Sequence, residues 1–258
     1  MIKNKLITML KVDFRRMFTT KLFYIMIGVA FVAPILILVM TSMMDGTVSV
    51  NPQTGVETVV EGFDYVWQII ATPKNSDSMS MGLVSMCNIN MFYFAIAVLV
   101  TIFISDDFRS GYCKNLFTSR SKKGEYVTSK IVVLSLCSAL MLIAFFLGAL
   151  MGGAISNLSF DLNGVNVSNV VMCMISKIML VLVFVPIYVV MSVVGKSKLW
   201  MSILGACAIS ALLFMMVPII SPLDSTIINV ILSLVGGLLF TIGLKIVSEK
   251  ILNKTSLI

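Results

Sequence analysis

Six long apolar stretches, separated by polar segments, constrain this chain more than any other feature of its sequence. Each stretch has about 21 to 25 residues, which as a helix crosses a hydrocarbon core of about 30 Å. Within lipid the backbone N–H and C=O groups must pair inside the segment, so each stretch is expected to be an α-helix. The six predicted spans are Phe23–Met44, Leu83–Ser105, Ile131–Ile155, Val170–Val194, Leu199–Ile220 and Ile227–Val247. The expected fold class is an all-α membrane protein with six transmembrane helices.

Lys and Arg residues lie almost entirely on one side of the predicted spans. Seventeen of the 19 fall in the amino-terminal segment, in residues 106–130 and 195–198, or in the carboxyl-terminal segment. By the positive-inside rule this side is cytoplasmic, so both termini are predicted to be cytoplasmic. The net charge of +7 is then explained by topology and by attraction to anionic headgroups, and it does not indicate nucleic-acid binding.

The chain has too little sequence outside the spans to build a second, soluble domain. Of its 258 residues 59% are hydrophobic and 12% are charged, and the two longest connecting segments are short. We therefore predict a single transmembrane domain over residues 1–258, with an external segment at 45–82 and a cytoplasmic loop at 106–130.

Residues 1–22 are predicted to form a basic amphipathic helix ahead of the first span. Apolar side chains, among them Phe14, recur at three- and four-residue steps, and Arg15 takes the opposite arc. Two interpretations remain: a leader that only sets topology, or an interfacial elbow helix with Phe14, Arg15 and Arg16 at the headgroups. Asp13 falls on the apolar arc, where it either pairs with Arg16 one turn later or faces a partner.

The external segment 45–82 shows structure of its own. Thr47–Val50 and Val56–Val60 are short β-branched runs around a turn with Pro and Gly, which predicts a hairpin. Phe63–Ala71 is apolar and aromatic but too short to span, so it is expected at the outer interface. The segment has a net charge of −4, which fits either a solvated cap or a docking surface for a cationic substrate.

Small residues and prolines punctuate the predicted spans. The small residues are Ala144, Gly148 and Gly152 in the third span and Gly236, Gly237 and Gly243 in the sixth. Such residues allow neighbouring helices to approach closely, and packing is favoured over a role in lining a substrate path. The prolines, which are expected to kink their helices, are Pro34, Pro186 and Pro218.

Lys177 is the one charge well inside a predicted span. It lies about seven residues from the outer end of the fourth span, where a charged side chain is costly. Its amine either snorkels towards the outer headgroups or makes a polar contact in a translocation path or a dimer seam.

Several kinds of chemistry are disfavoured by what the sequence lacks. It has no histidine, so histidine ligation of haem and histidine proton relays are excluded. No carboxylate falls mid-span, which disfavours proton- or sodium-coupled transport. Gly195-Lys196-Ser197 resembles the end of a phosphate loop, but Val190 replaces its first glycine and the segment joins two spans. The five cysteines include no CxxC pair and none lies in an external loop, so neither a disulfide framework nor a zinc site is expected. Without histidine, mid-span carboxylates or a paired nucleophile and base, no catalytic residues are expected.

The loop between the second and third spans carries the densest pattern in the chain. Residues 106–130 start with acidic and aromatic residues, followed by a glycine, a short helical stretch, an arginine turn and a new helix start. We favour a docking element that transmits motion from a cytoplasmic partner over a passive stop-transfer loop. The residues of the pattern are Asp107, Phe108, Arg109, Gly111, Lys114, Asn115, Leu116, Ser119, Arg120, Glu125, Tyr126 and Lys130.

In this loop the sequence resembles the ABC-2 type transport permeases, the membrane subunits of one class of ATP-binding-cassette exporter. The run from Asp107 to Leu116 is similar to the family's acidic, aromatic and basic residues ahead of a glycine and a basic-Asn-Leu triplet. The six-span plan and the basic elbow helix agree with it. The resemblance covers the whole chain in topology and residues 106–130 in motif.

The resemblance implies that residues 106–130 include a coupling helix that contacts a separate nucleotide-binding subunit. It also implies that the spans form half of a translocation path, completed by a second copy or a paralogue. ATP and Mg would bind to the partner, so this chain needs no cofactor and is not itself an enzyme. The implied coupling residues are Asp107, Phe108, Arg109, Gly111, Lys114, Asn115, Leu116, Arg120, Glu125 and Tyr126.

The chain is similar in size and lysine content to small bacterial permeases that export amphipathic peptides, such as toxins and lantibiotics, or confer immunity to them. The predicted function is therefore the permease subunit of a peptide exporter in a bacterial cell membrane. The alternative is a non-transporting membrane anchor or sensor in a signalling or immunity complex.

Overall fold

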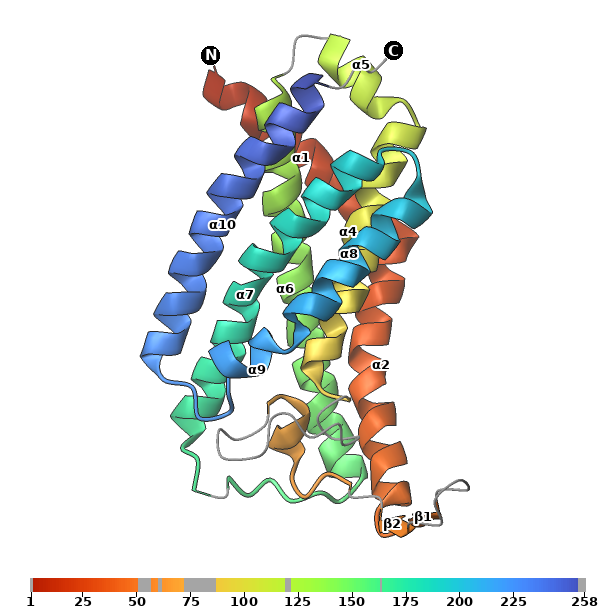
Figure 1. Cartoon of the computed structure of the whole chain (residues 1–258), viewed down its shortest axis with the longest axis vertical. Helices are drawn as coiled ribbons and strands as arrows, with labels where there is room; N and C mark the ends of the chain where they lie inside the picture. Colours follow the sequence, from red (N-terminus) through yellow and green to blue (C-terminus); the bar gives the residue numbers. More distant parts are fainter. Residues whose placement is uncertain are drawn as a thin grey trace.

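The structure is a computed structural model that describes residues 2–50, 57–59, 62–71, 87–118, 122–162 and 164–254. The described helices are α1 (Ile2–Thr19), α2 (Lys21–Met44), α4 (Phe92–Arg109), α5 (Tyr112–Thr118), α6 (Lys123–Ile155), α7 (Val167–Gly195), α8 (Leu199–Phe214), α9 (Met216–Ile220) and α10 (Ile227–Lys254). The shorter elements are β1 (Val48–Val50), β2 (Glu57–Val59) and the 3-10 helices η1 (Val66–Ile69) and η2 (Ile89–Met91). Figure 1 shows a helical bundle with both ends of the chain, and α5, at one end.

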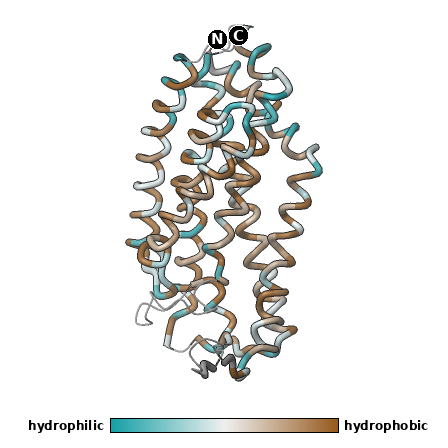
Figure 2. The backbone as a smooth tube through the Cα atoms, turned by 45° about the vertical axis from the view of Figure 1, so that its right-hand side comes forward, coloured by the Kyte–Doolittle hydropathy of each residue, from teal (hydrophilic) through white to brown (hydrophobic). Residues whose placement is uncertain are grey.

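In this part of the chain five helices are long and apolar enough to cross a membrane. They are α2, α4 with η2, α6, α7 and α10. Figure 2 shows hydrophobic residues along most of the bundle's length and hydrophilic ones gathered near the end that carries the termini. We call this the terminal end and the other the hairpin end, after β1 and β2.

The fifth predicted span, Leu199–Ile220, is interrupted. The helix α8 ends at Phe214 and α9 starts at Met216. Pro218 explains the interruption, because it has no N–H to donate to the Phe214 carbonyl and its ring crowds that carbonyl. α8 alone has 16 residues, which leaves it shorter than the five candidate spans.

The second predicted span, Leu83–Ser105, has its helical start in the wrong place. The α-helix starts at Phe92, and the first four residues of the predicted span lie outside the described residues. The side chain of Asn88 accepts a hydrogen bond from the backbone N–H of Asn90 at 3.0 Å and so caps η2. An apolar composition alone did not reveal this polar cap.

The second and third predicted spans correspond to α4 and α6, and both helices extend into the predicted cytoplasmic loop at the terminal end. α4 extends to Arg109, and α6 starts at Lys123, eight residues before the predicted span. With α5 between them, the segment predicted as a loop is mostly helical.

The interior of the bundle is formed by α4, α6 and α7, while α2 and α10 bury little of their length. Gly148 and Gly152 let α6 pack closely on α2: a Cβ added at Gly148 would lie 2.1 Å from the Phe31 carbonyl oxygen. The packing role predicted for this stripe is confirmed. In α10 it holds for Gly237, which faces α7, but an added Cβ at Gly236 or Gly243 would meet nothing within 4 Å.

At the hairpin end, β1 and β2 pair antiparallel with Val48 opposite Val59, so the predicted hairpin is confirmed. The predicted interfacial segment Phe63–Ala71 contains η1, whose Val66 and Ile69 side chains are fully buried. Val66 fits against Gly153 of α6, where an added Cβ would lie 2.2 Å from the valine Cγ2. The Val66 and Ile69 side chains of η1 are therefore covered by the bundle.

Candidate functional site

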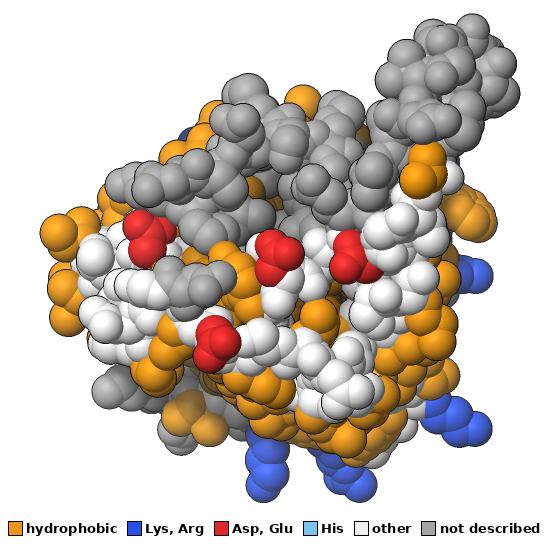
Figure 3. Space-filling model, turned by 90° about the horizontal axis from the view of Figure 1, so that it is seen from below, with side chains coloured by type: hydrophobic (Ala, Val, Ile, Leu, Met, Phe, Trp, Pro, Cys, Tyr) orange, Lys and Arg blue, Asp and Glu red, His pale blue; other side chains and the backbone are white. Residues whose placement is uncertain are grey.

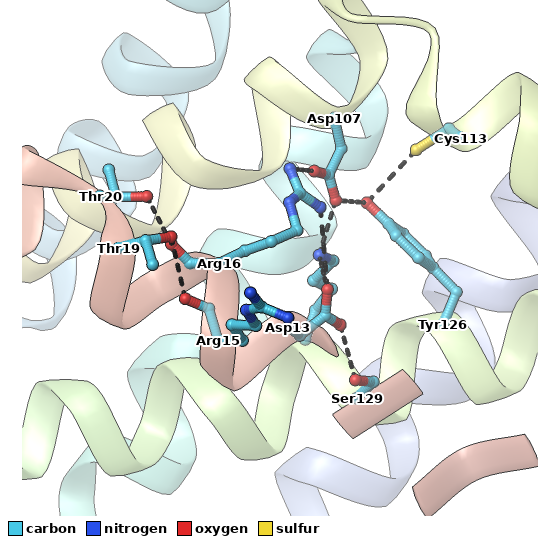
Figure 4. A network of polar contacts seen from close by, with 10 residues as sticks. Asp13, Arg15, Arg16, Thr19, Thr20, Asp107, Cys113, Tyr126 and Ser129 are labelled. Atoms are coloured by element: carbon cyan, nitrogen blue, oxygen red, sulfur yellow. Dashed lines mark hydrogen bonds and ion pairs between the residues drawn. The ribbon is translucent and has the colours of Figure 1, made fainter. Parts of the chain in front are cut away.

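The elements of the patterned loop pack against α1 at the terminal end. Gly111 lies at the reversal between α4 and α5 with φ of +73°, a conformation that glycine adopts without a Cβ clash. At the other side of the site α1 ends at Thr19, and the hydroxyl groups of Thr19 and Thr20 donate to the carbonyls of Arg15 and Arg16. Figure 4 shows the second of these turns, with Thr19 and Thr20 at the end of α1.

Four charged side chains from three helices meet between these turns (Figure 4). The Lys130 Nζ of α6 lies 2.7 Å from an oxygen of Asp13 in α1 and 2.7 Å from an oxygen of Asp107 in α4. Arg16 of α1 reaches Asp107 at 2.6 Å and Asp13 at 3.8 Å. Two positive and two negative charges therefore balance, and we call these four residues the charge cluster.

Every carboxylate oxygen of the cluster has a partner. The second oxygen of Asp13 accepts from the Ser129 hydroxyl at 2.6 Å. Asp107 Oδ2 accepts from the Tyr126 hydroxyl at 3.0 Å, in addition to its ion pair with Lys130. The side chains of Asp13, Asp107 and Lys130 are fully buried, so this complete pairing offsets the cost of removing them from solvent.

Aromatic rings enclose the two cations of the cluster. The Arg16 guanidinium lies 4.3 Å from the ring centroid of Tyr112, and the Lys130 amine lies 4.5 Å from that of Phe103. Burial lowers the pKa of Arg16, but the ion pairs with Asp107 and Asp13 outweigh this effect and raise the pKa. Arg16 therefore stays charged.

A thiol and a phenol extend the site towards α5. The Cys113 Sγ donates to the Tyr126 hydroxyl at 3.4 Å, and the Tyr126 hydroxyl in turn donates to Asp107 Oδ2. Burial raises the pKa of the Cys113 thiol to about 12, so this thiol is protonated at neutral pH. Within the described residues no group of His, Cys, Asp or Glu side chains is arranged to hold a metal ion.

The structure divides the predicted loop residues into two sets. Asp107 and Tyr126 are buried in the site, where a partner subunit has no access to them. Arg109, Lys114 and Asn115 are exposed, and Arg120 lies outside the described residues. The remaining predicted residues, which are partly buried, are Phe108, Gly111, Leu116 and Glu125.

The residues predicted for the elbow helix also have different positions. Arg15 is exposed, Phe14 is partly buried and stacks on Phe18, and Arg16 belongs to the charge cluster. Asp13 pairs with Arg16, as one of the two predictions had it, and also with Lys130. Asp13 and Ser129 were not predicted as site residues, and Lys130 belonged to the loop pattern but not to the implied coupling residues. An aspartate on an apolar arc was the signal that a buried cation lies opposite.

Lys177 lies in the interior of the bundle, apart from this site. Its side chain is 1% exposed, and its Nζ donates to Asn90 Oδ1 at 2.9 Å. The prediction that the amine snorkels to the outer headgroups is therefore wrong, because Asn90 of η2 provides a polar partner inside the bundle.

Comparisons with known proteins identify the family. The sequence model of the ABC-2 family transporter proteins matches residues 9–208, which include α1 from residue 9 onwards, the charge cluster, the patterned loop and Lys177. No curated protein and no solved structure matches the chain. The matched region covers more than half of the chain, and its apolar helices make it a multi-pass membrane protein. The chain therefore belongs to the ABC-2 transporter family of membrane proteins.

Proposed function

We propose that this chain is the permease subunit of an ATP-driven exporter, and that the loop around α5 couples it to a separate ATPase subunit. The observation that carries the proposal is the division within the loop. Its buried residues fasten α4 and α6 to α1 through a charge cluster without unpaired carboxylates, while Arg109, Lys114 and Asn115 remain exposed. A loop whose base is held rigidly and whose polar face is exposed suits an element that transmits motion from the ATPase subunit to α4 and α6.

A second observation supports docking at this face. The Glu125 Oε2 atom is buried and has no hydrogen-bond partner among the described residues. An unpaired acceptor of this kind is costly, and a donor from a docked subunit would satisfy it once the Glu125 side chain turns outward on docking. Glu125 lies in the first turn of α6, next to the cluster residue Tyr126.

In the proposed topology the terminal end is cytoplasmic and the hairpin end is external. Basic residues dominate the terminal end, in accord with the positive-inside rule. Together α8 and α9 would form the fifth of six spans, and α1 would be an elbow helix lying along the inner headgroups. The chain would be in the cell membrane of a bacterium.

In the proposed exporter the chain supplies no catalytic group of its own. ATP and Mg would bind to the partner ATPase, and a second copy or a paralogue would complete the translocation path. The α7–α8 turn, whose sequence resembles the end of a phosphate loop, supports the assignment of ATP binding to the partner. α7 ends at Gly195, and a Cβ added there would lie 2.1 Å from Ser202 Oγ, so the space beside Gly195 is filled by the chain itself.

The proposed substrate is an amphipathic cationic peptide, exported or expelled for self-immunity. Figure 3 shows acidic side chains gathered on the hairpin end, and the described acidic residues there are Asp45, Asp64, Asp161 and Asp224. A surface of this charge raises the local concentration of cations. Uptake of such a peptide into inverted vesicles with ATP distinguishes an exporter from a non-transporting anchor.

The coupling role is tested by charge reversal on the exposed face of the loop. In the double variant Arg109→Glu and Lys114→Glu, we expect co-purification of the ATPase subunit to fall at least about tenfold, which corresponds to about 1.4 kcal/mol of binding. The measurement is the amount of ATPase retained on the affinity-tagged chain, together with its ATP turnover.

The matched control is Lys196→Glu with Lys198→Glu in the α7–α8 turn. These two lysines are exposed and lie between spans at the same end of the bundle. If both double variants retain the ATPase equally, or both lose it equally, the coupling surface is not the α5 loop.

A further inference from the structure

Backbone hydrogen bonding is interrupted within α7 and again after α8. In α7 Pro186 has no N–H to donate to the Leu182 carbonyl, four positions earlier. α8 ends at Phe214, and α9 starts at Met216. The chain between these interruptions runs to the end of α7 and returns along α8, and we call residues 187–214 the α7–α8 arm.

The two interruptions lie at the same depth in the bundle. Phe184, two positions before Pro186, and Leu213, two positions before Met215, both line an apolar cavity of about 340 Å³. The other walls of this cavity include residues of α9 and α10. Because close-packed interiors resist deformation, free volume at this depth gives side chains room to shift when the helices bend.

The carbonyl that Pro186 leaves without a helical partner is bonded from another helix. The Thr241 hydroxyl of α10 donates to the Leu182 carbonyl at 2.9 Å. Thr101 and Thr128 instead donate to the carbonyl four positions earlier in their own helices. An unpaired carbonyl is costly in lipid, and this bond lies entirely on one side of the kink, so the bend of α7 can change while the carbonyl stays paired.

On the hairpin-end side of the two interruptions, hydrogen bonds hold α7, α9 and α10 together. The Ser176 hydroxyl pairs with the Ser233 hydroxyl of α10 at 2.8 Å. Asn229 Nδ2 of α10 donates to the Ile220 carbonyl of α9 at 2.8 Å. Together with the bond at the kink, these contacts fasten α9 and α10 to residues 167–182, and we call this assembly the α7–α10 unit.

The α7–α8 arm has contacts of its own between its two helices. The Tyr188 hydroxyl lies 2.6 Å from the Ser210 hydroxyl, and a Cβ added at Gly205 would meet the end of the Met191 side chain. Tyr188 also donates to the Tyr93 carbonyl of α4 at 3.1 Å. This contact with α4 lies beside the kink, so it leaves the far end of the arm free to move.

From these contacts we propose that the α7–α8 arm moves as one unit on two hinges, Pro186 and Met215. Its far end is the turn with Lys196 and Lys198 at the terminal end of the bundle. The segment from Pro186 to Gly195 is about 14 Å long, so a change of about 20° in the kink moves the far end by about 5 Å. The inference goes beyond the proposed function, because the hinges lie within this chain and their movement requires no ATPase.

The experiment measures distances between spin labels on the full chain in phosphatidylcholine nanodiscs by pulsed electron paramagnetic resonance. The labels are carried by p-acetylphenylalanine, so the native cysteines stay in place. The arm pair replaces the exposed Trp200 of α8 and Ile246 of α10, and the control pair replaces the exposed Val171 and Ile228 within the α7–α10 unit. We expect the distance distribution of the arm pair to be about 5 Å wider than that of the control pair.

Removing the proline at either hinge is expected to narrow the distribution of the arm pair. Pro186→Ala and Pro218→Ala each restore an N–H for the carbonyl four positions earlier. The matched control is Pro34→Ala, because Pro34 lies inside α2 and not at either hinge. This control should leave the distribution unchanged.

A double-mutant cycle tests the bond at the kink. Thr241→Val removes the donor to the Leu182 carbonyl, so it is expected to lower Tm by roughly 2–8 °C. In Pro186→Ala the restored N–H takes this carbonyl, so the same substitution should lower Tm much less. The control is Thr101→Val, which should have the same effect in both backgrounds because the Thr101 hydroxyl bonds its own helix.

Three results would overturn the proposal. Equally narrow distributions for the two label pairs in the unaltered chain would show that the arm does not move. An arm-pair distribution that stays wide in both Pro186→Ala and Pro218→Ala, or narrows as much in Pro34→Ala, would show that the movement is not at these hinges. Equal losses of Tm from Thr241→Val with and without Pro186 would show that the kink does not free the carbonyl.

Discussion

The charge cluster and Lys177 are two buried ionic sites with opposite design. In the cluster two carboxylates and two cations from α1, α4 and α6 neutralise one another, and each carboxylate oxygen is paired. Lys177 is as deeply buried but has an amide oxygen as its described partner. Fully paired carboxylates suit a permanent joint between helices, whereas Lys177 has no carboxylate partner among the residues that the structure describes.

The largest expected difference comes from making the same substitution at both lysines. Lys130→Met leaves two buried carboxylates short of a cation, so we expect a loss of about 3–5 kcal/mol in the free energy of unfolding. Lys177→Met leaves one amide oxygen unpaired but also removes an uncompensated charge, so the net change is expected to be under about 1 kcal/mol. Denaturant unfolding in nanodiscs measures both, and equal losses would remove the distinction between the sites.

A smaller effect is expected from neutralising one acid of the cluster. Asp107→Asn keeps the shape but weakens the bonds from Arg16, Lys130 and Tyr126, which should cost about 1.5–3 kcal/mol. The control is Asp106→Asn, one residue earlier and exposed, where the change should be within about 0.5 kcal/mol. If the two variants unfold alike, the cluster does not hold the loop.

The smallest expected effect is on the labelling rate of Cys113, which reports directly on whether the charge cluster opens. Because burial raises the pKa of its thiol to about 12, very little of the reactive thiolate is present at pH 8. Maleimide should therefore leave Cys113 unmodified in the folded chain at neutral pH. The labelling rate should increase as the pH rises, and the substitution Asp107→Asn should also increase it. Peptide mass mapping checks this, and rapid labelling of the unaltered chain would contradict the buried site.

Local sequence was enough to predict the helical, membrane-spanning character of the chain. Apolar runs of sufficient length predicted α2, α6, α7 and α10. Pro218 predicted a kink in the fifth span, where the structure has an interruption between α8 and α9. The hairpin and the packing role of Gly148 and Gly152 also followed from local patterns. The start of α4 did not, because Asn88 caps the short 3-10 helix η2 ahead of Phe92.

The candidate site was predicted only in part. The loop pattern pointed to Asp107 and Tyr126, but as surface residues for a partner, whereas both are buried against α1 and α6. Lys130 belonged to the pattern, yet its two aspartates come from other helices, and one of them lies 117 positions away. Pairing over such a distance leaves no periodic trace in a single sequence.

What the sequence by itself determined is which segments must be helices in lipid and which end of the bundle is basic, because backbone hydrogen bonding and charge distribution are local properties. What only the tertiary structure decided is the partner of each buried charge. The sequence places Asp13 on an apolar arc, Lys130 at the end of the loop and Lys177 inside a span, but it does not show which groups from other helices face them. The packing of α1, α4 and α6 neutralises the first two, while the packing of α4 on α7 leaves the third with an amide, because a counter-ion depends on which helices become neighbours.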